Sequence, residues 1–326
     1  MTSIPRARSW ASISRRISGE DIRRSLIQFR GAAPARHRFT VIGFPWDFGS
    51  SLGRPGSRYG PDEIRRSAAW NLNRVREGRV WDVEGGALVD LNAADISDAG
   101  DVEIAAHDTE LTFGRCQAMV TAALEAGRFP IVLGGDHAIS LPPIRALAAA
   151  SSRIGIVQLD AHLDLVDFSP RQGSLSQSNQ IRRALELPQM RSARLIQVGL
   201  RGLNYPEYFD FCRRQGITQL TASQALEAGA AVVADRCLEV AGAEGAAIYL
   251  TLDIDALDPA SAPGAGAHEH GGLTPAFVSV LLRRLAPHVA AFDIAEVNPL
   301  FDFQGMTSNL ASKLMWDLIL ARVAAT

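Results

Sequence analysis

Lysine is nearly absent from this chain of 326 residues, because the 33 basic residues comprise one lysine, Lys313, and are otherwise arginine. The acidic residues number 35, which leaves a formal net charge of −2. Proteins that bind nucleic acid usually carry a basic excess or a basic face, so this near balance argues against a nucleic-acid partner. We attribute the arginine preference to a GC-rich coding bias and not to phosphate recognition.

Cysteine is also scarce, and the three cysteines, Cys116, Cys212 and Cys237, lie far apart in the sequence. An odd, scattered set excludes a disulfide framework and a CxxC metal site and is typical of a reducing compartment. The sequence has no run of 18 or more apolar residues, so we expect neither a transmembrane helix nor a membrane partner. These absences predict a cytoplasmic protein.

The start of the chain differs in composition from the rest, with four arginines and no acidic residue before Glu20. A transit peptide has this composition, but an N-terminal extension in contact with solvent is the interpretation we favour. We therefore predict an extension over residues 1–37. No internal repeat or low-complexity linker divides residues 38–326, and we interpret them as a single domain.

Short apolar runs recur along that domain and predict strands that are buried on both faces of a sheet. Each run is too short for a helix and is rich in β-branched residues. The six clearest runs are Phe39–Phe44, Phe129–Leu133, Ile154–Leu159, Leu195–Val198, Ala247–Leu252 and Val289–Ile294.

Segments with helical character alternate with these runs. The expected helices are Asp108–Ala126, Leu141–Ala150, Tyr205–Gln215 and Thr274–Leu285, and a further helix begins near Gly60. Thr274 is a predicted N-cap that is followed by Pro275 at the first helical position. Alternation of strand and helix predicts an α/β fold in which a parallel sheet carries helices on both faces.

Acidic and histidine residues follow four of the predicted strands directly. These segments are Gly134–His137, Asp160–Asp164, Asp253–Pro259 and Glu296–Pro299. Ligands of parallel α/β sheets bind outside the carboxyl ends of the strands. We therefore expect the polar side chains of the four segments to converge at one edge of the sheet.

Alternate residues of an extended segment point in the same direction. This spacing groups Asp160 with His162 and Asp164, and it groups Asp253 with Asp255. Each group can therefore direct several ligands at one point.

Four aspartates in one place repel one another and lose hydration, so a cation must offset them. Two divalent ions would balance four carboxylates, with His137 and His162 as neutral donors. A set of imidazoles and carboxylates without thiolate favours Mn²⁺, with Ni²⁺ second and Co²⁺, Fe²⁺ or Zn²⁺ as further candidates. A paired-metal site lowers the pKa of a bridging water and presents hydroxide to an electrophilic carbon. The pattern thus predicts a hydrolase.

Three blocks of the sequence resemble the ureohydrolase family of arginase, agmatinase, guanidinobutyrase and formiminoglutamase. They are GGDHAIS at Gly134–Ser140, DAHLD at Asp160–Asp164 and TLDIDALDPASAPGAG at Thr251–Gly266. Two further blocks, Pro45–Arg65 and Val198–Gly202, look more like the agmatinase branch than like arginase. The resemblance covers about residues 38 to 322.

The resemblance implies a three-layer α/β/α fold with a parallel, eight-stranded sheet, and a binuclear metal site that usually holds manganese. By motif position the implied metal ligands are His137, Asp160, His162, Asp164, Asp253 and Asp255. Asp160 and Asp253 are the implied bridging carboxylates, and Glu296 matches the acid that binds the guanidinium group. A planar cation pairs well with a carboxylate in two-pronged geometry. Family members are typically trimers or hexamers.

The implied reaction is attack of a metal-bridging hydroxide on a guanidinium carbon, which yields urea and an amine. The agmatinase-like blocks favour a guanidine without an α-carboxylate. Candidate substrates are agmatine, guanidinobutyrate, guanidinopropionate, guanidine itself and alkylated guanidines or biguanides. An acidic substrate would need an arginine near the mouth of the site, and the candidates are Arg54, Arg58, Arg171 and Arg201.

The chain departs from the family pattern in the loop after DAHLD. An agmatinase-like sequence reads SHGTPFRRA there, whereas this chain reads SQSNQIRRA over Ser176–Ala184, with Gln177 in place of the histidine. Glutamine exchanges hydrogen bonds but does not carry a proton at neutral pH. Either the proton path or the substrate therefore differs from that of agmatinase. Gln177 is a candidate catalytic residue in this altered role.

A second departure follows the Asp-Pro motif, where the family often reads GTGTPEPGGLT. This chain carries His268 and His270 in the corresponding segment, residues 264–274. One interpretation is that one of these histidines supplies the missing proton shuttle or contacts the substrate, because loops on a rigid scaffold are often functional. The alternative is an exposed polar loop.

Two other functions remain open at this stage. A formiminoglutamase-like enzyme would hydrolyse a formimino group and release formamide, and Gln177 is consistent with it because those members also lack the histidine. A non-catalytic metal-binding subunit of a hetero-oligomer is the other alternative, although the six implied ligands are all present. A nucleotide-binding module fits worst, since no GxGxxG or P-loop follows a predicted strand.

Overall fold

The computed structural model describes residues 29–30, 35–50 and 54–325. Most of the predicted N-terminal extension, residues 1–28 and 31–34, therefore lies outside the described residues. Within the described ranges, no helix combines the length and the apolar character that a membrane span requires.

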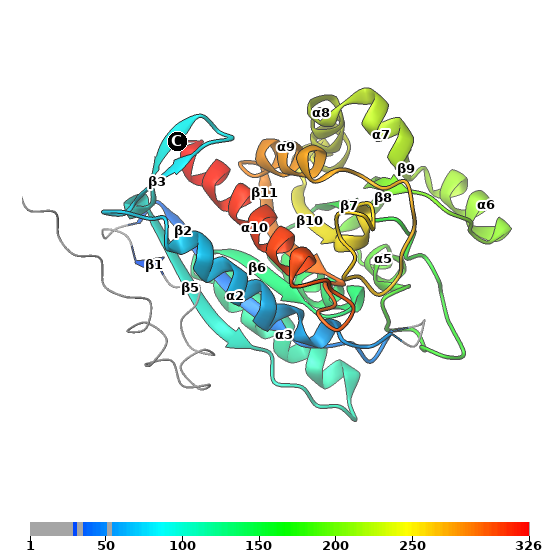
Figure 1. The fold of residues 1–326 in the computed structure, drawn as a ribbon. Coiled ribbons are helices and arrows are strands. Elements are labelled where there is room, and N and C mark those ends of the chain that lie inside the picture. The colour runs from blue at the N-terminus through cyan, green and yellow to red at the C-terminus, as the bar shows by residue number, and fades with distance from the viewer. Residues whose placement is uncertain (1–28, 31–34, 51–53, 326) are drawn as a thin grey trace, which may run out of the picture.

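A nine-stranded sheet forms the middle layer of the molecule (Figure 1). Its order is β1-β5-β2-β6-β11-β10-β7-β8-β9. The strands are β1 (Phe29–Arg30), β2 (His37–Phe44), β5 (Ala94–Asp101), β6 (Phe129–Gly134), β7 (Ile154–Leu159), β8 (Met190–Leu200), β9 (Thr218–Thr221), β10 (Ala247–Asp253) and β11 (Val289–Ala295). All neighbouring strands from β5 to β9 pair in parallel, whereas β1 pairs with β5 in antiparallel fashion. The predicted parallel sheet of eight strands is confirmed, with β1 added at its edge.

Helices cover both faces of this sheet. One layer contains α2 (Gly60–Leu72), α7 (Ala222–Ala228), α8 (Ala230–Ala241), α9 (Pro275–Leu285) and α10 (Met306–Ala324). The other layer contains α3 (Thr109–Glu125), α4 (Leu141–Ala150), α5 (Gln180–Ala184) and α6 (Pro206–Gln215). Figure 1 shows α2 and α10 side by side on the first face, next to the small hairpin of β3 (Arg79–Asp82) and β4 (Ala87–Asp90). The predicted three-layer α/β/α architecture is confirmed.

Alternate side chains of the central strands enter cores on opposite faces of the sheet. In β7, Val157 and Leu159 pack in the core beneath α8, α9 and α10, whereas Ile154 and Ile156 pack in the core beneath α4 and α5. All four side chains are fully buried. A strand that is buried on both faces is almost continuously apolar, as β7 is apart from Gln158, which explains why these runs could be recognised in the sequence.

Strands β5 and β9 were missed because neither has such a run. The sequence of β5, ADISDAGD, is acidic, and arginines from neighbouring segments supply the missing partners. Arg65 on α2 donates from Nε to Asp98 Oδ2 at 2.7 Å and from Nη1 to Asp101 Oδ1 at 2.6 Å. Arg128 donates from Nη1 to Asp95 Oδ2 at 2.7 Å. The acids of β5 thus form ion pairs with residues that are distant in sequence, and local sequence does not reveal such pairs.

The predicted start of α9 is confirmed in detail. The Thr274 side chain accepts a hydrogen bond from the backbone N–H of Phe277, and Pro275 occupies the first turn. The cap satisfies one of the amide groups that have no partner inside the helix.

Replacement of Arg65 by methionine should destabilise the fold. The side chains of Arg65 and Asp98 are each 4% exposed, so the substitution leaves a buried carboxylate without its partner. Loss of one member of a buried pair costs about 3–5 kcal/mol. Urea denaturation should show this loss in the free energy of unfolding, whereas Arg66→Met on the same helix should cost less than about 1 kcal/mol because Arg66 is 56% exposed. Equal losses in the two variants would contradict the assignment.

Candidate metal centre

Four adjacent strands of the sheet, in the order β6-β11-β10-β7, lead into the predicted site residues. His137 follows β6, Asp160 follows β7, Asp253 ends β10 and Glu296 follows β11. Because these strands are parallel, their carboxyl ends lie at the same edge. The predicted convergence of the four segments is therefore observed.

Two short 3-10 turns set the direction of the chain at this edge. Asp136 caps the turn His137–Ser140 by accepting from the backbone N–H of Ala138 at 3.0 Å. Asp253 caps the turn Ile254–Ala256 by accepting from the backbone N–H of Asp255 at 2.8 Å. Aspartate is a favoured cap because its oxygen pairs with an otherwise unpaired N–H. Each cap thus places a candidate ligand within a tight turn.

The first group of candidate ligands surrounds the Nδ1 atom of His137. Carboxylate oxygens lie 3.0 Å away on Asp160, 2.9 Å away on Asp164 and 3.0 Å away on Asp253. All four residues are buried. His137, Asp160 and Asp253 form one of the two groups of described residues whose ligand atoms lie close enough together to hold one metal ion.

The other ring nitrogen of His137 determines which atom faces this cluster. Nε2 lies 2.8 Å from the Oγ1 atom of Thr251, and that hydroxyl donates its hydrogen to Asp293 Oδ1 at 2.7 Å. The Thr251 oxygen must therefore accept from His137, which places the ring proton on Nε2. Nδ1 is buried and, among the described residues, has no hydrogen-bond partner of acceptable geometry. A lone pair and three carboxylates that meet at one point suit a cation.

The second group consists of Asp160, His162 and Asp255. His162 Nδ1 lies 3.1 Å from Asp255 Oδ2 and 3.4 Å from Asp160 Oδ1. The backbone N–H of Ala161 donates to Asp255 Oδ1 at 3.1 Å and holds that carboxylate in place. Asp160 belongs to both groups, which is the arrangement required of a bridging carboxylate. The structure thus gathers all six residues that the sequence analysis singled out as metal ligands.

The crowding of these groups raises the pKa values of three of them. Burial disfavours a charge on His137, but the nearby carboxylates of Asp160, Asp164 and Asp253 outweigh burial and raise its pKa well above the usual range. Burial and the charge of Asp160 raise the pKa of Asp164 to about 7. Burial and the charge of Asp255 raise the pKa of Asp253. A proton or a metal ion must therefore occupy the cluster at neutral pH, and metal binding displaces such protons.

Backbone strain marks two of the site residues. Asp164 and Glu296 adopt φ angles of 53° and 62°, in the left-handed region that residues other than glycine rarely enter. Such strain persists where surrounding contacts over-determine the conformation, and it is concentrated at functional sites.

Glu296 lies beside the first group, with its carboxyl group fixed by one backbone contact. The backbone N–H of His137 donates to Glu296 Oε1 at 2.9 Å. Burial, followed by the charge of Asp136, raises the pKa of Glu296 well above its usual range. A cation placed against this side chain would favour its charged form.

A cavity of about 370 Å³ opens onto both groups and onto Glu296. Its walls include Val166, Gln177, Asn204, Tyr205, Tyr208 and Glu269. The sequence analysis singled out Gln177 but missed the other five. Glu269 could have been predicted from its position between His268 and His270, which were both candidate site residues. Asn204, Tyr205 and Tyr208 lie in a segment without a recognisable motif.

His268 and His270 flank Glu269, but the described residues that line the cavity include neither of them. His268 Nε2 lies 2.8 Å from the carbonyl oxygen of Pro263, and its Nδ1 lies 3.5 Å from Arg54 Nη1. His270 is exposed. Both ring nitrogens of His268 thus contact other groups of the protein.

The four arginines considered for an acidic substrate are likewise absent from the described lining of this cavity. Arg58 donates to Asp47 at 2.6 Å, and Arg201 donates to backbone carbonyls, among them that of Asp255 at 2.6 Å. Arg54 stacks on Phe301, and Arg171 is exposed. The ionisable residues in the described lining are therefore acids, histidines and tyrosines.

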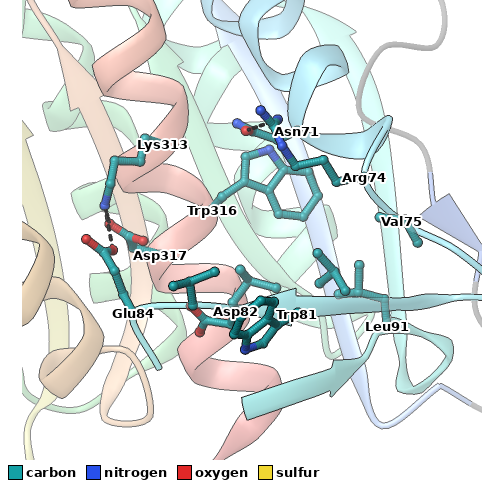
Figure 2. Close-up of a pocket in the computed structure, with 13 residues that line it drawn as sticks. Asn71, Arg74, Val75, Trp81, Asp82, Glu84, Leu91, Lys313, Trp316 and Asp317 are labelled. Carbon is teal, nitrogen blue, oxygen red and sulfur yellow. Dashed lines mark hydrogen bonds and ion pairs between the residues drawn. The ribbon is translucent and has the colours of Figure 1, made fainter. Parts of the chain in front are cut away.

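A second cavity of about 220 Å³ lies between α2, α10 and the β3–β4 hairpin (Figure 2). Figure 2 shows Lys313 directed toward Glu84 and Asp317, with Nζ–oxygen distances of 2.8 and 2.6 Å. The described residues that line this cavity include none of the candidate metal ligands. Because the carboxylates of this cavity pair with Lys313 and Arg283, the chemistry is assigned to the cavity at the sheet edge.

The profile of the arginase family matches residues 37–321 of this chain. Proclavaminate amidinohydrolase of Streptomyces clavuligerus is 32% identical over 288 residues, which covers 88% of each chain. Its solved structure covers 94% of this chain and 99% of its own, with a TM-score of 0.78 and 30% identity.

Guanidinobutyrase of Pseudomonas aeruginosa is 32% identical over 280 residues, covering 85% of this chain and 84% of its own. Agmatinase of Bacillus subtilis is 31% identical over 289 residues, covering 87% of this chain and 91% of its own. The three identities are nearly equal, so overall similarity does not separate their substrates. The profile and these relatives together place the chain in the arginase family, among its amidinohydrolases.

Proposed function

We propose that this chain hydrolyses the C–N bond of a guanidino compound to urea and an amine, with two divalent metal ions held by the two ligand groups. One observation carries the proposal. The two ligand groups have Asp160 in common, and the buried carboxyl group of Glu296 lines the same cavity as they do. The donors are imidazole and carboxylate, which suits Mn²⁺ first and Ni²⁺ second. A closed trimer or hexamer of this chain is part of the proposal, by resemblance to the family.

When bound, the two ions supply the Lewis acidity that activates water for attack on carbon. The protein residues then have separate roles. Asp160 spans the two groups, His137 and His162 each donate one imidazole nitrogen, and Glu296 binds the guanidinium group. His137 keeps its Nδ1 lone pair available because its proton is held on Nε2 by Thr251.

Gln177 is proposed to contact the substrate, because it lines the cavity. Its amide can hold the leaving amine or the guanidinium N–H groups by hydrogen bonds but cannot transfer a proton. We assign His268 and His270 no direct contact with the substrate, since neither belongs to the described lining.

The charge of the cavity supports a substrate whose tail is neutral or cationic. Glu269 adds a further acid to the wall, whereas the described lining holds no arginine or lysine. A carboxylate tail would meet like charges there and lose hydration without a partner. Agmatine or an alkylated guanidine therefore fits the cavity better than guanidinobutyrate.

The first test is a screen for urea release from a panel of guanidine, agmatine, an alkylated guanidine and guanidinobutyrate, with Mn²⁺-loaded and Ni²⁺-loaded protein. We expect urea from agmatine or the alkylated guanidine, with kcat/KM at least about 10-fold above that for guanidinobutyrate, which corresponds to about 1.4 kcal/mol. Faster turnover of guanidinobutyrate would contradict the proposal that the substrate has a neutral or cationic tail. A formimino substrate is assayed in parallel, and release of formamide from it would support the alternative reaction. No product from any of these compounds with two metals bound would support a non-catalytic subunit.

Replacement of Asp253 by alanine should remove metal and activity together. The variant deletes a carboxylate that faces His137 Nδ1, so we expect fewer than two bound metal ions per chain and a loss of at least about 100-fold in turnover. Metal analysis by mass spectrometry and the urea assay measure both effects. Asp167→Ala is the matched control, because Asp167 is exposed and pairs with Arg183 outside both groups.

Replacement of Glu296 by glutamine should separate substrate binding from metal binding. Two metal ions should remain bound, while kcat/KM falls by about 100-fold or more because the guanidinium group loses a charged partner. The outcome that would refute this role is loss of metal from the variant in the same analysis.

A further inference from the structure

We propose that Gln219, Gln197 and Gln158 form a one-way amide relay that positions the carboxylates of Asp160 and Asp164 for metal binding. This inference rests on the proposed metal site. It assigns a positioning role to glutamines that lie beneath the cavity and that the catalytic proposal does not use.

The three glutamines occupy matched positions on adjacent strands at one side of the sheet. Gln158 pairs in register with Gln197, and Gln197 pairs in register with Gln219, across β7, β8 and β9. Gln219 Nε2 donates to Gln197 Oε1 at 2.8 Å, and Gln197 Nε2 donates to Gln158 Oε1 at 2.7 Å. Gln158 Nε2 then donates to Asp160 Oδ2 at 2.6 Å and also contacts Asp164 Oδ2 at 3.4 Å.

The carboxylates determine the direction of the whole relay. An ionised carboxylate accepts hydrogen bonds but donates none, so the amide nitrogen of Gln158 must face Asp160. The oxygen of Gln158 then faces Gln197, which must present its own nitrogen, and the same argument applies to Gln219. A reversed amide at any position would place two oxygens or two nitrogens in contact.

Two further contacts fix the loop that carries the ligands. Gln197 Nε2 also donates to the carbonyl oxygen of Leu163 at 2.8 Å, and Gln180 on α5 donates from Nε2 to Asp164 Oδ2. Asp164 is the ligand with the strained backbone. The amides therefore hold the side chain of Asp164, whose backbone conformation is unfavourable without such contacts.

These hydrogen bonds are buried, so their loss is not compensated by water. Gln158, Gln197 and Gln180 are at most 1% exposed, so water cannot replace an amide that is removed. Hydrogen bonds in such a network strengthen one another, and an unpaired buried group is costly. The relay keeps the ligand oxygens oriented without adding a positive charge that would compete with a metal ion.

The test is the affinity for Mn²⁺, measured by titration calorimetry on the full-length protein, in a double-mutant cycle. Gln158→Met keeps the shape of the side chain and removes its hydrogen bonds, and should weaken Mn²⁺ binding by about 10- to 100-fold. Gln197→Met touches no metal ligand, yet should weaken binding by about 3- to 10-fold because it breaks the relay. In the double variant, the effect of Gln197→Met should shrink by more than half.

Full additivity of the two substitutions would overturn the relay, as would an unchanged affinity in Gln158→Met. The absorption spectrum of Co²⁺-loaded protein provides a second readout. Gln219→Met should shift its ligand-field bands only if the relay reaches the ligands, because the hydrogen bonds of Gln219 go to Gln197 and Cys212 and not to the ligand loop. If Gln158→Met does not fold, the cycle is repeated with Gln197→Met and Gln219→Met, and additivity there overturns the relay equally. Failure of the wild-type chain to bind Mn²⁺ would instead refute the proposed metal site.

Discussion

Repulsion among buried carboxylates is the constraint on which the rest of this structure depends. Asp160, Asp164, Asp253 and Asp255 lie together at the carboxyl edge of the sheet, with at most 8% of any of them exposed. Such a cluster is unfavourable unless cations, protons or hydrogen-bond donors offset it. The surrounding structure supplies donors, and two metal ions would supply the charge.

The donors come from several levels of the structure. Backbone N–H groups of the two 3-10 turns hold Asp136 and Asp253, and the backbone N–H of Ala161 holds Asp255. Thr251 fixes the tautomer of His137, and glutamine amides donate hydrogen bonds to Asp160 and Asp164. The ligands are held by packed neighbours on rigid strands, so the site is preorganised. Metal binding therefore costs little conformational entropy of the ligand side chains.

The cavity above the ligand groups has a different character, because its walls come from loops and from the start of α6. Asn204, Tyr205, Tyr208 and Glu269 belong to these walls. Loop residues on a rigid scaffold set substrate choice in many folds. The relatives named above act on different substrates at nearly equal overall identity, so overall similarity does not decide the substrate of this chain.

The sequence by itself determined the fold class, six of the strands and the residues of both ligand groups, because each leaves a local signal. Buried strands have almost continuous apolar runs, and ligands that share a loop recur at a spacing of two residues. The tertiary structure decided what local sequence cannot contain. The acids of β5 are paired by arginines that are distant in sequence. His137 meets Asp253 because the sheet order leaves only β11 between β6 and β10. The glutamine relay likewise depends on the register of three strands that are distant in sequence, and a lone glutamine in an apolar run gives no sign of it.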